Sequence, residues 1–449
     1  MKKSRILYAV VAVLMLAALM AGCNKDTTTS SAPPAPESSA PAPESSAPAP
    51  APALSSLEQL LNMDNKRPLA GLQPGHLESR ASINKALPVT DDGHITIAWA
   101  SASQASSFFT EMTRSAKAAC DKYGYEFLMQ VTTDFSLEEQ ITQIENFLTQ
   151  DIDFLVVNAI DIDATVVYYQ QAVDMGVPVI VVGPTAGKHE YPIVTTVLSG
   201  SFESGWVVGE YVAEKLFNDY NGKELEVGFV FSRTDDADSN SRPCGFVGAY
   251  LYKQAELNGK PYASRWDAAL DGYNYWTTCI NSGSSTIPGI MKLLGYEPGG
   301  GTDTYSGQVA AEKLLTRFAK MDLLFADTDS LSPGVLQAIT EAGMTPGEDI
   351  LVCTGADAAD YTLLNIIDGK ILATGTNAPY YTGESVVELI QSIFNGFDAN
   401  DLPASSYTPT YCVNVDNVNN YYNPDLKFAP ALPWDVETVD QYNTRNANA

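Results

Sequence analysis

The sequence predicts an α/β protein made of two lobes, each a doubly wound parallel sheet with helices on both faces. From about His94 onward, short runs that are apolar throughout alternate with amphipathic helical segments. Strands that are apolar on both faces are typical of parallel sheets covered by helices on both sides. The alternation repeats too often for one small sheet, so two similar lobes with a cleft between them are expected.

The first half of this pattern has clear helix boundaries. Ser136 and Glu139 have capping-box spacing, and an apolar face follows them. Gly124 and Gly176 each close a helix. The predicted strands are 95–101, 125–131, 152–159 and 177–183, and the predicted helices are 106–124, 135–150 and 163–176.

The alternation continues in the second half after an interruption. The segment from Asn258 to Tyr305 is rich in Gly, Ser, Tyr and Trp and breaks the rhythm. The predicted helices are 203–217, a helix that starts near Gly245, 307–318, 333–343, 359–369 and 382–394. The predicted strands are 225–232, 322–328, 350–357 and 371–377.

The N-terminus reads as an export signal. Residues 1–22 have a basic start, a short apolar run and small residues before Cys23, and the apolar run is too short for a comfortable membrane span. The stretch 19–23 resembles a bacterial lipobox, with Met20 where Leu is usual; the alternative is an ordinary cleaved signal with an incidental cysteine. We expect lipid on Cys23, a Pro/Ala/Ser-rich tether over 23–54 and an N-terminal extension over 55–93.

Composition excludes several classes of protein. The formal net charge of −28 argues against nucleic acid and anionic lipid surfaces as partners. Three isolated histidines and the lack of a CxxC pair predict no metal and no cofactor. Cys244 and Cys279 are one possible disulfide pair, but cysteines scattered in this way more often are buried small apolar residues.

Four segments in order resemble one known family. They are GVPVIVVG (176–183), SRPCGFVGAY (241–250), LLFADTDSLSPGVLQAITEAG (323–343), and GAD with YTLLNIIDGKILAT (355–357 and 361–374). This order is similar to that of the type 1 periplasmic binding proteins, the ribose/galactose-binding group that feeds sugar importers. The resemblance implies three hinge crossings, with lobe 1 formed by 94–199 and 378–402. Lobe 2 then comprises 200–377 and 403–449, with an insertion over about 258–305.

The resemblance also implies where a ligand binds, because parallel sheets bind ligands beyond the carboxyl ends of their strands. A sugar needs aromatic surfaces for its C–H faces and charged or amide groups for its hydroxyls. Phe108 and Phe109 fall where the family has stacking aromatics, although at least one of them has a core contact as its alternative. Asn158 falls on a polar contact position, with an Asx turn as its alternative.

The remaining candidates lie in lobe 2. Arg242 is a forked donor for neighbouring hydroxyls or else a surface Arg. Asp357 is a carboxylate acceptor or else a helix cap. Thr328 and Asp329 replace the family's Asn-Asp pair, and Asp329 has helix capping as its alternative. Candidates beyond these are Asn377 at a strand end and, in the interrupting segment, Tyr305 or Trp276, whose alternative is a packed surface excursion.

One feature departs from the family. Ribose binders carry an Asp-Arg pair at the end of the strand that here ends in Gly183-Pro184, and a later polar pair falls on Gly200-Ser201. Lobe 1 is therefore expected to be poorer in charged contacts than lobe 2. This argues against a ribose binder of the usual design.

The predicted function is a monomeric, lipid-anchored, extracytoplasmic solute-binding protein that delivers a small polar ligand, a sugar, to an ABC permease. The alternative is a receptor subunit coupled to a membrane histidine kinase or chemoreceptor. We do not expect an enzyme, because the sequence has no Gly-x-Ser-x-Gly elbow and the acids of FADTDS (325–330) have no histidine partner. The export signal and the lack of a basic helix-turn-helix exclude a repressor of the same fold.

Overall fold

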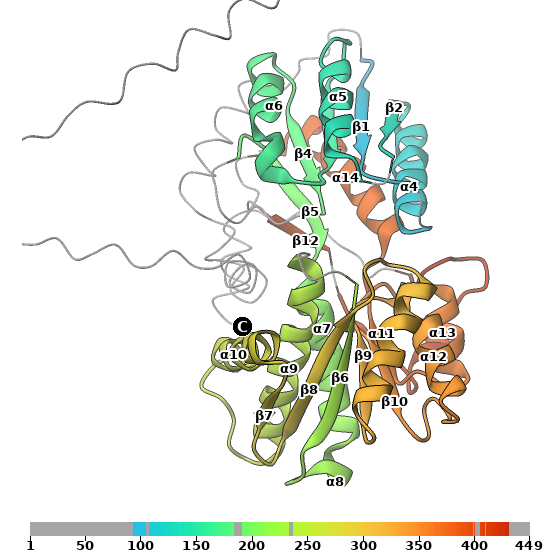
Figure 1. Cartoon of the computed structure of the whole chain (residues 1–449). Coiled ribbons are helices and arrows are strands. Elements are labelled where there is room, and N and C mark those ends of the chain that lie inside the picture. Colours follow the sequence, from blue (N-terminus) through green and yellow to red (C-terminus); the bar gives the residue numbers. More distant parts are fainter. Residues whose placement is uncertain are drawn as a thin grey trace, which may run out of the picture. The chain divides into compact units, whose positions relative to one another are not determined.

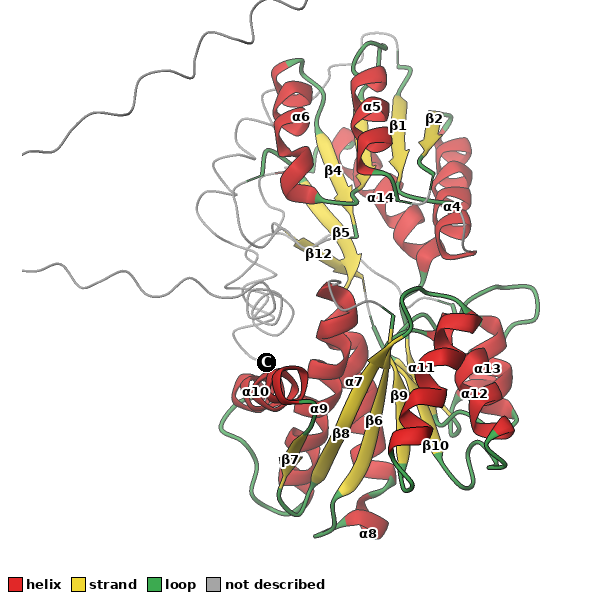
Figure 2. Cartoon of the chain, viewed as in Figure 1, coloured by secondary structure: helices red, strands yellow, loops and turns green. Residues whose placement is uncertain are grey.

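The computed structural model describes residues 93–104, 107–133, 135–183, 191–232, 237–397, 399, 405–408 and 410–430. The predicted signal, Cys23, the tether and nearly all of the extension lie outside these residues. Two sheets are present, and each has helices on both faces (Figures 1 and 2). No helix in the described part of the chain has the length and apolar character needed to span a membrane.

The first sheet is entirely parallel, with the strand order β12-β5-β4-β3-β1-β2. Its strands are β1 (Thr96–Ser101), β2 (Glu126–Val131), β3 (Phe154–Asn158), β4 (Val179–Val182), β5 (Thr195–Ser199) and β12 (Ser405–Thr408). Its helices are α4 (Ser107–Tyr123), α5 (Leu137–Phe147), α6 (Ile162–Asp174) and α14 (Pro379–Phe394).

Burial of β1 explains why this sheet carries helices on both faces. Ile97 and Trp99 lie in one apolar cluster with α4 and α14, whereas Ala98 and Ala100 lie in another with α5 and α6. Because successive side chains of a strand point to opposite faces, a strand that is apolar throughout needs a helical layer on each side. The edge strand β2 is the exception, since three of its six side chains are exposed.

The second sheet has the order β13-β11-β10-β9-β6-β8-β7, parallel except for the antiparallel edge pairs β13–β11 and β7–β8. Its strands are β6 (Leu225–Phe231), β7 (Ser285–Ile287), β8 (Met291–Pro298), β9 (Leu323–Ala326), β10 (Leu351–Thr354), β11 (Ala373–Gly375) and β13 (Cys412–Asn414). Helices α7 (Ser201–Lys215), α9 (Ala237–Leu257) and α10 (Arg265–Ser282) cover one face, and α11 (Thr304–Arg317), α12 (Ser332–Glu341) and α13 (Asp360–Ile367) cover the other. Short helical turns are α8 (Phe217–Tyr220), η1 (Asp329–Leu331) and η3 (Val418–Asn420).

The chain passes three times between the two sheets, after β5, after β11 and after β12. The second and third crossings are joined by two hydrogen bonds: Thr376 N donates to Tyr411 O at 3.0 Å, and Tyr411 N donates to Thr376 Oγ1 at 2.9 Å. The last crossing lies later than the predicted boundary after Leu402. Strand β12 pairs with β5 and so completes the first sheet before the chain returns to the second.

Two predicted boundaries in the second lobe also differ. The helix that carries Arg242 has already begun at Ala237, so Arg242 lies inside α9 and not before it. The predicted insertion is largely regular, because it holds α10 and the hairpin of β7 with β8, and β8 pairs with β6 inside the sheet. Trp276 is fully buried beside Phe229, as expected of a packed segment.

Close packing of α7 against α9 sets the position of Arg242. A Cβ atom on Gly205 of α7 would lie 1.9 Å from the carbonyl oxygen of Arg242. The two backbones are therefore in direct contact, which only a glycine permits. The five cysteines of the described region are unpaired, and Cys244 and Cys279 are buried thiols.

Candidate ligand-binding site

Five of the predicted residues lie at the carboxyl edge of the second sheet: Arg242, Thr328, Asp329, Asp357 and Asn377. The carboxylate of Asp357 follows β10 and accepts two hydrogen bonds there. Thr328 Oγ1 donates to its Oδ2 at 2.7 Å, and Asn377 Nδ2 donates to its Oδ1 at 3.2 Å. Helix α13 begins at Asp360 and receives no side-chain cap. Asp357 thus does not cap that helix, and its carboxylate joins the ends of β9, β10 and β11.

The loop that carries Asp357 has an unusual backbone. Asp357 has φ of 104° and Ala358 has φ of 54°, a region that residues other than glycine rarely adopt. Asp329 forms hydrogen bonds with the residues that flank Asp357 and Ala358: Asp329 N donates to Ala356 O at 3.0 Å, and Ala359 N donates to Asp329 Oδ2 at 2.7 Å. Backbone strain of this kind is found at ligand sites, where the surrounding structure fixes it.

Asp329 is a support for this loop and not a helix cap. Its side chain is fully buried, and Oδ1 accepts from the hydroxyls of Thr354 and Thr374. Burial, and then the charge of Asp357, raise the pKa of Asp329 to about 7. The side chain therefore ties β10 and β11 to the Asp357 loop.

Arg242 supplies positive charge to the same place. Its side chain is 8% exposed, and its Nη1 donates to the carbonyl oxygen of Asp327 at 3.2 Å. Burial raises the pKa of Asp327 and of Asp357, and the Arg242 charge opposes that rise at both carboxyls. A buried guanidinium beside two carboxylates is a polar centre and not a surface Arg.

Asp327 also belongs to this centre, although it was not among the site residues predicted from the sequence. Ser232 Oγ donates to its Oδ2 at 2.6 Å, and Ser232 N donates to the same oxygen at 3.2 Å. Oδ1 is buried and has no hydrogen-bond partner in the described part of the chain. Asp327 directly follows the apolar strand β9 and precedes Thr328. An acidic residue at the carboxyl end of a buried strand is the feature of the sequence that could have indicated it.

The corresponding edge of the first sheet carries neutral groups. Asn158 is 6% exposed and joins strand ends: Ala102 N donates to its Oδ1 at 3.4 Å, and its Nδ2 donates to Val182 O at 3.1 Å. These bonds cross between strands, so they are not an Asx turn. Gly183 directly follows β4 and has φ of 104°, and a Cβ there would lie 3.4 Å from Asn158 Nδ2. Its backbone thus favours glycine where ribose binders are expected to carry Asp.

A row of four aromatic rings runs from the first lobe to the C-terminal segment: Phe135, Phe109, Phe108 and Phe428. Consecutive ring centroids are 5.4, 5.4 and 6.3 Å apart, and every pair has edge-to-face geometry. Phe109 also packs against the core of the first lobe, and Phe135 is 41% exposed. Phe108 is half-buried and, unlike Phe109, does not pack against the first-lobe core, which leaves it as the stronger candidate for ligand contact.

Tyr305 lies apart from these groups. It is the second residue of α11 and is 74% exposed.

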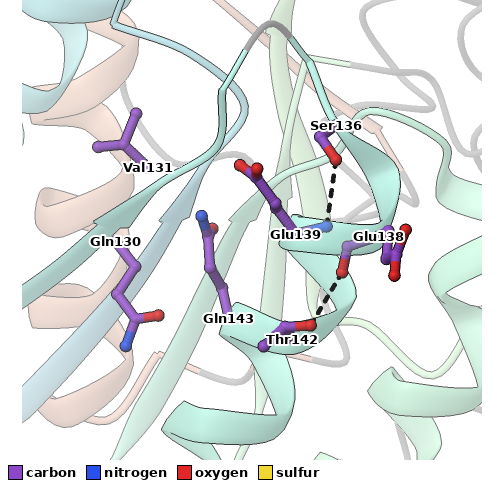
Figure 3. Close-up of a pocket in the computed structure, with 7 residues that line it drawn as sticks. All are labelled: Gln130, Val131, Ser136, Glu138, Glu139, Thr142 and Gln143. Atoms are coloured by element: carbon purple, nitrogen blue, oxygen red, sulfur yellow. Dashed lines mark hydrogen bonds between the residues drawn. The ribbon is translucent and has the colours of Figure 1, made fainter.

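A pocket on the first lobe lies between β2 and α5, away from the polar centre of the second sheet, and Figure 3 shows the residues that line it. There Ser136 caps α5 by accepting from Glu139 N at 3.3 Å, which confirms half of the predicted capping box. The Glu139 carboxylate accepts from Thr133 N instead.

Comparison with known proteins decides the family. Residues 97–397 match the model described as periplasmic binding protein domain. The chain belongs to this family. The architecture of two parallel sheets joined by three crossings confirms the predicted type 1 periplasmic binding protein fold.

Relatives of this periplasmic binding protein include sugar-binding proteins. The chain is 24% identical to the ribose import binding protein of Bacillus subtilis, over 64% of this chain and 78% of the relative. It is 22% identical to the galactofuranose-binding protein of Escherichia coli, over 64% and 79%. These relatives are binding proteins, in agreement with the prediction that the chain is not an enzyme.

Solved structures agree with this fold. A galactofuranose binding protein has a TM-score of 0.56 at 18% identity, with 73% of this chain and 96% of that chain covered. A solute-binding protein of Actinobacillus succinogenes with bound D-allose has a TM-score of 0.57 at 17% identity, with 73% and 100% covered. Across the described residues of this periplasmic binding protein, no group of three His, Cys, Asp or Glu side chains is placed to hold a metal ion.

Proposed function

We propose that this periplasmic binding protein captures a sugar between its two lobes and delivers it to an ABC importer. The chain is held at the outer face of the membrane through lipid on Cys23 and acts as a monomer. The observation that carries the proposal is the polar centre of Asp357, Arg242, Thr328 and Asn377 at the carboxyl edge of the second sheet.

This centre has the chemistry that a polyol requires. A fixed carboxylate accepts from two neighbouring hydroxyls, and a guanidinium donates to one or two more. The aromatic row offers ring faces and edges for the C–H side of a sugar. The names of several relatives and solved structures support sugars and related polyols as the class, because they include ribose, galactofuranose, D-allose and the polyol myo-inositol.

The first sheet argues for a sugar other than ribose bound in the usual way. Its strand ends carry the neutral Asn158 and Gly183, and Gly183-Pro184 stands where ribose binders are expected to carry an Asp-Arg pair. With hydrogen bonds concentrated on the second lobe, the site suits a ligand that presents its hydroxyls to one side and an apolar face to the other.

The test is a thermal-shift screen of residues 54–449 with D-ribose, D-allose, L-arabinose, D-galactose and myo-inositol, and with nucleosides and amino acids as the comparison set. A ligand that binds only the folded state raises the melting temperature, by an amount that grows with its concentration. We expect at least one sugar or polyol to do so. A shift with nucleosides or amino acids alone would contradict the sugar assignment.

The anchor has a separate test. Cells that express the full chain and a Cys23→Ser variant are fed labelled palmitate. Label on the wild type and none on the variant is the expected result, because the thiol is the only lipid attachment point proposed. Equal labelling of the two chains, or no labelling of either, would contradict lipidation at Cys23.

A further inference from the structure

A short C-terminal segment is bonded to the loop that carries Asp357. The strap is defined here as Lys427–Pro430, and it runs antiparallel to residues 358–360. Asp360 N donates to Lys427 O at 2.8 Å, and Ala429 N donates to Ala358 O at 2.8 Å. An antiparallel bridge pairs Ala359 with Phe428, and Lys427 Nζ lies 3.0 Å from Asp360 Oδ2.

The strap is also held from the other end. Tyr380, in helix α14 of the first lobe, donates its hydroxyl to Ala429 O at 2.5 Å. Tyr411, at the third crossing, donates its hydroxyl to Pro430 O. Phe428 is 3% exposed, and its ring meets the ring of Phe108 edge-on, with centroids 6.3 Å apart and planes at 90°. The strap thus contacts elements of both lobes.

The position of the strap matters because of the strained backbone at Asp357 and Ala358. Asp329 grips this loop on one side through Ala356 and Ala359. The strap grips it on the other side, where it uses the Ala358 carbonyl and the Asp360 amide. A left-handed conformation is unfavourable at residues other than glycine, so it persists only where neighbours fix it.

From these contacts we propose that the strap is a positioning element of the ligand site. Phe428 stabilises the backbone of the loop that carries Asp357, and its ring packs edge-on against the ring of Phe108. One residue therefore connects the polar centre to the aromatic row. The inference rests on the proposed function for its ligand. It goes beyond the family match, which ends at residue 397 and does not include the strap.

The test compares three substitutions at one position and two truncations. Phe428→Ala removes the ring, Phe428→Leu keeps apolar volume without a ring, and Phe428→Tyr keeps the ring. Truncation after Asn423 removes the strap. The matched control is truncation after Pro433, which removes only residues beyond the strap.

Two measurements are made on each variant. The first is hydrogen exchange of the 355–363 segment without ligand. The second is the dissociation constant for whichever compound of the thermal-shift panel stabilises the wild type. We expect Phe428→Ala and truncation after Asn423 to speed exchange and to weaken binding about tenfold, the size of one edge-on aromatic pair. Phe428→Tyr and truncation after Pro433 should remain within about threefold of the wild type.

Phe428→Leu separates positioning from simple packing. If the ring contact with Phe108 matters, this variant keeps its melting temperature but binds weakly. Full rescue of binding by Leu would overturn the proposal, as would unchanged exchange or unchanged affinity in Phe428→Ala. If no sugar binds the wild type, the proposed function fails. The proposal about the strap is then tested by the hydrogen-exchange rate of the 355–363 segment together with the affinity for whichever other panel compound binds. If no compound binds, the hydrogen-exchange rate alone tests it.

Discussion

The carboxyl edges of the two sheets differ in chemistry. The carboxyl edge of the second sheet carries Asp327 and Asp357 at strand ends and Arg242 from α9, and these groups are joined by hydrogen bonds and by charge. The first sheet ends in Asn158 and Gly183, whose polar atoms are committed to neighbouring backbone. Both edges are formed by the same alternation of strands and helices, so this alternation alone does not predict the chemistry of either edge.

The difference indicates a division of labour. A polar centre whose groups are already oriented loses little entropy when a ligand binds, and this suits directional hydrogen bonds. Aromatic rings supply area without direction, which suits the apolar face of a sugar. On the proposed function, the second lobe therefore selects hydroxyl geometry, and the first lobe contributes contact area.

The largest effect is expected at Asp357. Asp357→Ala should weaken binding of the sugar found in the thermal-shift screen about 100-fold, because it removes a charged acceptor and leaves Arg242 without that counter-charge. Titration calorimetry measures this loss. Asp368→Asn is the matched control: Asp368 is an exposed carboxylate at the end of α13 that pairs with Lys370. Wild-type affinity in a folded Asp357→Ala protein would place the site elsewhere.

A smaller effect is expected on the aromatic side. Phe108→Ala should weaken binding about tenfold with little change in melting temperature, since the ring lies outside the core clusters. Phe109→Ala should instead lower the free energy of unfolding by about 2 kcal/mol, because Phe109 packs against the first-lobe core. Equal loss of binding in both variants, with both melting temperatures unchanged, would contradict this distinction.

The pH dependence of stability tests the support beneath the polar centre. The pKa of Asp329 is raised to about 7 in the folded chain, whereas an unfolded Asp has about 3.9. The folded state holds this proton more tightly, so the Asp329 contribution to the free energy of unfolding falls as pH rises from about 4 to about 7. Asp329→Asn cannot titrate. The free energy of unfolding of the wild type minus that of this variant should fall by at least about 1 kcal/mol over that range.

Urea unfolding at about pH 5 and pH 7.5 measures that gap. Asp368→Asn serves again as the comparison, and its unfolding curve should follow the wild type at both pH values. A gap between wild type and Asp329→Asn that stays constant with pH would show that the Asp329 carboxyl does not change its protonation in this range.

Much of the fold could be predicted from the sequence, because apolar strands and amphipathic helices have local signatures. Strand β12 could not, since its residues are polar and its identity depends on pairing with β5. At the site, Asp357 and Arg242 stood in recognisable segments. Asp327 stood in one of these segments too, and Phe428 lay outside them all; neither role was predicted, because both come from contacts between segments far apart in the chain.

The smallest effect concerns Gly183, and it asks why the first edge lacks charge. At φ of 104° any side chain is strained, although space for a Cβ exists beside Asn158. Gly183→Ala should therefore lower the free energy of unfolding by about 1 kcal/mol or slightly more. The control is Gly124→Ala, where φ is 76° and a Cβ would meet nothing within 4 Å. Its cost should be smaller, because 76° lies nearer the left-handed region that other residues reach.

Gly183→Asp extends this test to function. If the backbone conformation at position 183 prevents a charged side chain from functioning there, Gly183→Asp has the same backbone strain as Gly183→Ala and does not bind D-ribose more tightly. Tighter D-ribose binding by Gly183→Asp than by Gly183→Ala would show the reverse. The two edges would then differ by side chain alone, and the first lobe would still hold the geometry of a ribose binder.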